Sequence, residues 1–175
     1  SMAVAGGSLG TASADVAGAR RQGRVALVGT ASWFRTDGAI PVAPESRGPV
    51  DTPADAEWLS FFGKLQIQGA ADRFIVSGWI GDDDRGNGTP VQRNRMQGGT
   101  VAVAWDRVVA ATQLAARVSF SPNSFDQTFS SVAAGRATSV SRFGLRRRLD
   151  AGVGDPVPPV RRGIRLRARC SPRRG

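Results

Sequence analysis

The sequence predicts an all-β protein, built as an antiparallel up-and-down meander of strands. Three observations lead to this prediction. Apolar and polar residues alternate with a period of two through most of the first 120 residues, and this is the spacing of a β-strand. The connections between the alternating segments are short and long in turn. One of the two faces that the alternation creates is strongly polar.

Six segments carry enough alternation to be placed as strands. In the third of them, Phe61, Leu65 and Ile67 alternate with Lys64 and Gln66. The fourth segment is apolar on both faces. In chain order, the predicted strands span Ser8–Ala19, Arg24–Arg35, Trp58–Gln68, Arg73–Gly81, Gly98–Asp106 and Ala110–Ser121.

The lengths of the connections favour a barrel in a membrane. Short turns are predicted at 20–23, 69–72 and 107–109, and long loops at 36–57, at 82–97 and from Pro122 onward. A meander therefore places all short turns at one rim and all long loops at the other, which is typical of transmembrane β-barrels. Strands of about ten residues also suit a tilted crossing of the bilayer. A soluble β-sandwich alternates too and has uneven loops, so this alternative stays open.

The polar side chains of the predicted strands would share the inward face of such a barrel. They are Lys64, Gln66, Gln68, Gln113 and Arg117. In a membrane barrel this face lines a water-filled lumen, whereas in a sandwich it faces solvent. We therefore expect a fragment of a transmembrane β-barrel.

The charge of the chain is concentrated near its C-terminus. The 175 residues carry a formal charge of +10, and residues 142–175 contribute 11 arginines against two acidic residues. Residues 1–141 are close to neutral. We expect two regions, a partial β-barrel at 1–141 and a basic low-complexity tail at 142–175 that is disordered.

The composition argues against an enzyme. There is no histidine, which excludes imidazole-based triads and His-ligated zinc. The single cysteine, Cys170, excludes a disulfide within the chain and a cysteine cluster for a metal. No 18 consecutive residues are apolar, so no transmembrane helix is predicted. We expect no catalytic residue, no metal site and no cofactor.

The stretch GDDDRGNGTP, from Gly81 to Pro90, is the most unusual local motif. An EF-hand loop that began at Asp82 would need glycine at its sixth position and an acid at its twelfth, where Asn87 and Arg93 stand. A phosphate loop would need a Gly-Lys-Ser/Thr end, which is missing. We expect a solvated loop tip. The residues in it that would contact a ligand are Asp82, Asp83, Asp84, Arg85 and Asn87.

Three segments resemble barrel segments of TonB-dependent outer-membrane receptors. They are FRTDGAIPVAPESRGPVDTPAD at 34–55, GDDDRGNGTPVQRNRMQ at 81–97 and SFDQTFSSVAAGRATS at 124–139. The resemblance covers about residues 8–141, and the order of the segments suits consecutive strands of one barrel. It implies a place in the bacterial outer membrane. It also implies energised uptake of a scarce nutrient, such as siderophore-bound iron or cobalamin.

The resemblance implies further parts of the receptor. Such receptors have about 22 strands and a plug inside the barrel. The six predicted strands would contact outer-membrane lipid and the missing barrel and plug segments, and we expect no transport by this chain alone. The aromatic girdles at the membrane surface would be supplied by Trp33, Phe34, Phe61 and Trp79.

The tail from Arg142 departs from the receptor pattern. It is rich in Arg, Gly, Pro and Ala without sustained alternation, which is the composition that GC-rich DNA gives when translated in a shifted frame. We expect a truncated receptor gene with a frame-shifted end. The alternative is a soluble β-rich binding module with an authentic arginine-rich tail that binds nucleic acid or anionic lipid.

Overall fold

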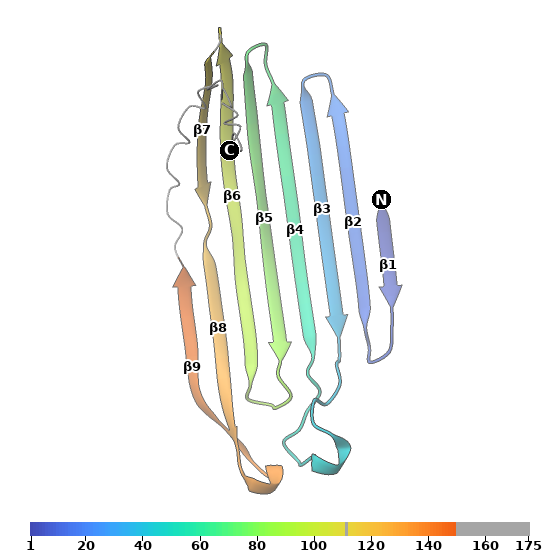
Figure 1. The fold of residues 1–175 in the computed structure, drawn as a ribbon. Coiled ribbons are helices and arrows are strands. Elements are labelled where there is room, and N and C mark those ends of the chain that lie inside the picture. The colour runs from blue at the N-terminus through green and yellow to red at the C-terminus, as the bar shows by residue number, and fades with distance from the viewer. Residues whose placement is uncertain (111, 150–175) are drawn as a thin grey trace, which may run out of the picture.

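The computed structural model describes residues 1–110 and 112–149, which form one antiparallel sheet of nine strands (Figure 1). The strands are β1 (Met2–Gly6), β2 (Ala12–Gln22), β3 (Val25–Thr36), β4 (Ala56–Gln68), β5 (Asp72–Gly86), β6 (Arg93–Val109), β7 (Thr112–Phe120), β8 (Asn123–Val132) and β9 (Ser139–Leu149). Two 3₁₀ helices, η1 (Pro44–Ser46) and η2 (Ala134–Arg136), lie in loops. Among the described residues, no helix combines the length and the apolar character needed to span a membrane.

The predicted all-β antiparallel meander is confirmed. Each strand pairs with the next in the chain except β7, which does not pair with β8, because both of them pair with β6. This strand is 17 residues long and pairs with β7 along Val101–Val109 and with β8 along Asn94–Gly98. β7 and β8 therefore share one position in the sheet. The break between them falls at Ser121 and Pro122, where proline has no N–H to give to a strand ladder.

Short and long connections lie at opposite ends of the sheet (Figure 1). One end, which we call the turn end, holds the connections at 23–24, 69–71 and 110. The other, the loop end, holds residues 7–11, 37–55, 87–92 and 133–138. The expected separation of turns from long loops is thus present. Every one of the three segments with a receptor-like sequence includes a connection of the loop end.

The strand boundaries differ from the prediction near both ends of the chain. The predicted strand Ser8–Ala19 contains a turn, because Leu9 and Gly10 have positive φ angles of 58° and 64°. β1 precedes this turn and β2 follows it. The segment after Pro122, predicted as a loop, forms β8 and β9. The predicted boundary between residues 141 and 142 falls inside β9, and the tail residues 150–175 lie outside the described residues.

The loop predicted at 82–97 is mostly strand. β5 continues to Gly86 and β6 begins at Arg93, so only residues 87–92 connect them. In this part of the hairpin, Asp84 lies opposite Arg95 and Asp82 lies opposite Gln97. Opposite charges across a strand pair stabilise a sheet without giving apolar alternation. This is the reason why apolar periodicity ended the two strands too early.

Both edges of the sheet are stepped. β1 pairs with Ala12–Val16, and Ser1 and Ala17 exchange hydrogen bonds of 2.7 and 2.9 Å. Residues 18–22 of β2 have no outer neighbour in the described part of the chain. At the other edge, β9 pairs with β8, while β7 has no strand on its outer side there. The sheet is therefore six strand positions wide at the turn end and eight at the loop end.

The sheet is a single layer whose two faces differ in chemistry. Residues directly opposite each other on neighbouring antiparallel strands point to the same face, so the register assigns each residue to a face. We call the face of Leu65 the apolar face and the face of Lys64 the polar face. Val50, in the β3–β4 loop, is the only buried apolar residue among the described ones. The apolar side chains of the sheet are therefore not in a core.

Candidate functional site

An apolar band crosses the apolar face from β2 to β7. One row of it consists of Leu27, Leu65, Val76, Val103 and Val118, which lie side by side on β3 to β7. The valines of this row are 42% to 55% exposed. Other large exposed side chains of the same band are Val16, Val25, Leu59, Phe61, Ile67, Phe74, Ile80, Val101 and Phe120.

Charged residues border this band at both ends. At the loop end, one row across β3 to β6 contains Arg35, Glu57, Asp84 and Arg95. At the turn end, Asp72 lies opposite Arg107, with 3.8 Å between the carboxylate and the guanidinium. From β3 to β6 the band is therefore apolar in its middle and charged at its two margins, whereas on β2 Arg20 lies opposite Leu27.

A tryptophan stands at each margin of the band. Near the loop end, the indole N–H of Trp33 donates a hydrogen bond of 3.2 Å to Glu57. Near the turn end, the indole N–H of Trp105 donates one of 2.9 Å to Asp72. Both indoles are on the apolar face, and both polar atoms are bonded to an acid of the charged margin. This is how an amphipathic ring sits between an apolar medium and a wet one.

The height of the band follows from the register. On β4, the level of Trp33 is marked by Leu59 and the level of Trp105 by Ile67. Nine residues span this distance, which is about 26 Å along a strand at about 3.3 Å per residue. On β4 the band is thus about 26 Å high between the levels of the two tryptophans.

Only part of the expected aromatic girdle lies on the apolar face. Trp33 and Phe61 do, whereas Phe34 and Trp79 lie on the polar face. Trp105 was not expected in a girdle, although its alternation with Val101 and Val103 is visible in the sequence. The hydrogen-bond partner of Trp105 could not be predicted from the sequence, because Asp72 is 33 residues away.

The polar face carries the side chains that the sequence assigned to it. Lys64, Gln66, Gln68, Gln113 and Arg117 all share this face. An ion pair joins β5 to β6 on it: Arg73 donates hydrogen bonds of 3.0 and 2.7 Å to Asp106, which is buried. Water is the medium that suits these groups, because unpaired amides and cations are costly in an apolar one.

The five candidate ligand residues are divided between the two faces. Four of them are in β5, where alternation sends Asp82 and Asp84 to the apolar face and Asp83 and Arg85 to the polar face. Asn87 lies in the β5–β6 loop, where its backbone N–H donates to the carbonyl of Gln92 at 3.0 Å. The three adjacent carboxylates therefore do not converge.

Each carboxylate of this group has a cationic partner. Arg85 donates bonds of 2.7 and 2.6 Å to the two oxygens of Asp83. Asp82 accepts from Arg95 at 3.0 Å, and Asp84 accepts from Arg93 at 3.0 and 2.8 Å. In the part of the chain that the structure describes, no three His, Cys, Asp or Glu residues are placed to hold a metal ion.

The two faces and their margins form an extended surface and not an enclosed active site. Comparison of the chain with protein-family models, with curated proteins and with solved structures gave no match. The chemistry of the surface therefore carries the functional argument.

The loops of the loop end are joined by an ion pair between distant parts of the chain. Arg136, in η2, donates bonds of 2.9 and 2.7 Å from its Nε to both oxygens of Asp51 and a further bond from Nη2. The backbone N–H of Gly48 also donates to Asp51, at 2.8 Å. The guanidinium and this N–H lower the pKa of Asp51 to about 2. The β3–β4 loop is thus fixed to the β8–β9 loop.

The β5–β6 loop joins the same group. Thr52 donates its backbone N–H to the carbonyl of Gly88 at 3.1 Å. Thr89, which is buried, donates to the hydroxyl of Ser130 at 3.2 Å, and Ser130 donates to Gln92 at 3.0 Å. We call the three joined connections the loop cluster. It gives the loop end a defined structure.

Proposed function

We propose that the chain forms part of the wall of a TonB-dependent outer-membrane receptor. In this proposal the apolar face contacts the hydrocarbon of the bilayer and the polar face borders the water-filled interior. The observation that carries it is the apolar band, nine residues high on β4 and bounded by Trp33 and Trp105.

The dimensions of the band support contact with a bilayer. A tilted strand crosses the hydrocarbon with about 9–11 residues, and the band has nine between its two tryptophan levels. Barrels in outer membranes carry an apolar belt flanked by aromatic residues at both surfaces. The indole N–H groups, bonded to Glu57 and Asp72 at the margins, suit such a position.

The exposure of the band also favours lipid over water. Soluble proteins rarely leave apolar patches of more than a few hundred Å² uncovered, and a sheet with one apolar face normally packs against a second layer. In the described residues no second layer covers Val101, Val118 or Phe120, which are 54%, 55% and 57% exposed. Hydrocarbon would cover them without further protein.

The receptor type is supported by the place of the receptor-like segments. The segments at 34–55, 81–97 and 124–139 each supply a connection of the loop end, where the loop cluster binds them together. Long loops of outer-membrane barrels face the outside of the cell. In the proposed receptor, the loop end would meet a nutrient such as siderophore-bound iron or cobalamin, and further strands and a plug would complete the barrel.

The four tryptophans allow a direct test, because two lie on each face. Trp33 and Trp105 are on the apolar face, and Trp58 and Trp79 are on the polar face. Four variants, each keeping one tryptophan and replacing the other three by phenylalanine, would be prepared in micelles containing brominated phosphatidylcholine. We expect strong quenching of fluorescence from Trp33 and Trp105 and weak quenching from Trp58 and Trp79. Equal quenching of all four, or the reverse order, would contradict the proposal.

A further inference from the structure

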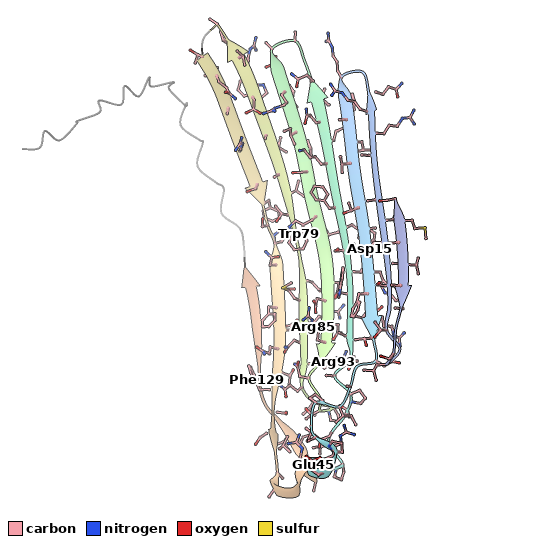
Figure 2. All side chains as sticks on the ribbon, turned by 45° about the vertical axis from the view of Figure 1, so that its right-hand side comes forward. Asp15, Glu45, Trp79, Arg85, Arg93 and Phe129 are labelled. Carbon is pink, nitrogen blue, oxygen red and sulfur yellow. The ribbon has the colours of Figure 1, made fainter. Side chains whose placement is uncertain are left out.

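A hollow on the polar face is lined by two indoles and an ion pair. It lies near the loop end and is lined by Trp58, Ser60, Trp79, Asp83, Arg85 and Met96. Trp79 and Met96 are 39% and 47% exposed on the polar face, where Phe62 lies opposite Trp79. Figure 2 shows Trp79 and Arg85 along β5, with Arg85 nearer the loop end. The aromatic residues here cannot serve the apolar band, because they point away from it.

The floor of the hollow is made by small residues. Ser60 on β4 lies opposite Gly81 on β5. The ring of Trp79 leans over this floor, since a Cβ added at Gly81 would be 3.2 Å from Cζ3 of the indole. On the loop side, Trp58 is supported from β3 by Phe34, with ring centroids 6.1 Å apart and planes inclined by 19°. Two indoles therefore flank a shallow floor.

The charged side chains of the hollow that lie on the polar face, Asp83 and Arg85, form an ion pair without net charge. Arg85 binds both oxygens of Asp83, and the two side chains are 57% and 23% exposed. Two of the five guanidinium N–H donors suffice for this pair, and a carboxylate accepts about four hydrogen bonds. The pair therefore still offers donors and acceptors side by side to a ligand, while it offers no net charge to attract an ion.

We propose that this hollow binds a neutral saccharide. A sugar ring has an apolar C–H face that packs on an indole, and hydroxyl groups at its rim that donate and accept at once. The two indoles suit the first property, and the Asp83–Arg85 pair suits the second. A charged aromatic compound could also stack on the indoles, but its charge would find no counter-charge, because Asp83 and Arg85 already neutralise each other. The inference does not depend on the proposed function, because the hollow is open to water on the polar face in either case.

The test measures binding of three hexasaccharides to the full chain in lauryldimethylamine-oxide micelles. The probes are maltohexaose, cellohexaose and chitohexaose, and the readout is saturation-transfer NMR with titration. We expect at least one probe to bind, and Trp79→Ala or Trp58→Ala to weaken it about three- to tenfold, the size of an aromatic contact of about 0.5–1.5 kcal/mol. The control Trp33→Ala, on the apolar face, should leave the affinity unchanged.

Two further variants keep the test informative if the alanine variants do not fold. Ser60→Leu fills the floor while both tryptophans are kept and should abolish binding, while Trp79→Phe keeps a ring and should retain part of it. The proposal is overturned if none of the three probes binds, or if Trp33→Ala weakens binding as much as Trp79→Ala. It is also overturned if 2-naphthoate binds at Trp79 while the saccharides do not, because the hollow would then select a planar anion.

Discussion

Asp51 shows how single residues hold the loop end together. Its carboxylate accepts hydrogen bonds from the Arg136 guanidinium and from the N–H of Gly48. In return, the carbonyl of Arg136 accepts the N–H of Val50, the buried apolar residue beside it, at 3.3 Å. The charge of the Asp51 carboxylate thus helps to hold the β3–β4 loop against the β8–β9 loop.

The pKa of Asp51 predicts how these loops respond to acid. Because this pKa falls from 3.8 to about 2 in the folded chain, the charged carboxylate stabilises the fold above about pH 4. The contribution is lost as the pH falls from about 4 to about 2. We expect the hydrogen-exchange protection factor of the Val50 N–H to be constant above pH 4 and to decrease below it. NMR detection of exchange at each pH would measure it.

The matched variants for this prediction are Asp51→Asn and Asp37→Asn. Asp51→Asn should lower the protection of Val50 above pH 4 to about the level that the wild type reaches near pH 2, and should remove the step between pH 4 and 2. Asp37 pairs with Arg35 at 3.5 Å with both side chains well exposed, so its replacement should keep the step. If the protection of Val50 still decreased between pH 4 and 2 in Asp51→Asn, another group would be responsible for the response to acid.

At the scale of strands, a row of glycines crosses the middle of the apolar face. Gly18, Gly29, Gly63 and Gly78 lie opposite one another on β2, β3, β4 and β5. Glycine in a strand interior lowers stability, because the unfolded chain has more freedom to lose. The surroundings of the four differ: a Cβ at Gly63 would meet nothing within 4 Å, and one at Gly78 would be 2.8 Å from the carbonyl oxygen of Thr100.

This difference predicts opposite effects of the same substitution on two paired residues. Gly63→Ala should raise the free energy of unfolding by about 0.5–1 kcal/mol, through loss of freedom in the unfolded chain. Gly78→Ala should lower it, because the new methyl group collides with the backbone of β6. Urea unfolding of the wild type and the two variants in lauryldimethylamine-oxide micelles would measure both changes in the free energy of unfolding. Equal shifts in one direction would refute the packing described here.

The sequence predicts the strands where alternation is apolar and misses them where it is not. Phe61, Leu65 and Ile67 suffice to place β4 and its two faces. The loop-end parts of β5 and β6 were not predicted as strands, because there charged residues such as Asp84 and Arg95 face each other and apolar alternation is missing. The pair of Asp51 with Arg136 is 85 residues apart and has no local pattern, so the loop cluster could not be predicted. The hollow was missed because Trp58 and Trp79 come together only through the register of β4 with β5.

For the whole molecule, the decisive property is a single layer with one apolar face. The bands of neighbouring strands are aligned by the register, so each apolar side chain adds to the same surface. In water such a surface drives association, because burial of apolar area is favourable. In a bilayer, lipid chains would cover the same apolar surface. We therefore expect the chain to associate in water and to remain monomeric in a bilayer.

Two neighbouring residues of β6 test this property. Val101 lies at the middle of the apolar band, in the row of Gly63 and Gly78, and Ala102 points to the polar face. Val101→Arg should lower the stability of the chain in phosphatidylcholine vesicles by about 2–4 kcal/mol, the cost of arginine at the midplane of a barrel wall. The same change should reduce association in detergent-free buffer. Unfolding titrations in vesicles and light scattering in buffer would measure the two effects.

Ala102→Arg is the control, since it adds the same charge one residue away on the polar face. It should leave the stability in vesicles and the association in buffer nearly unchanged. Equal losses for both variants would mean that the two faces meet the same medium, which the proposed wall does not allow.

The stepped edges set a condition on whatever continues this sheet. Within the described residues the sheet has six strand positions at the turn end and eight at the loop end, so its outline is a trapezoid, about 29 Å wide at one end and about 38 Å at the other for a spacing of about 4.8 Å. A cylinder cannot be closed from such outlines alone, because it would flare into a cone. Whatever backbone continues the sheet, from this chain or from another, would have to fill the notches beside β2 and β7 if the finished wall is to have parallel sides.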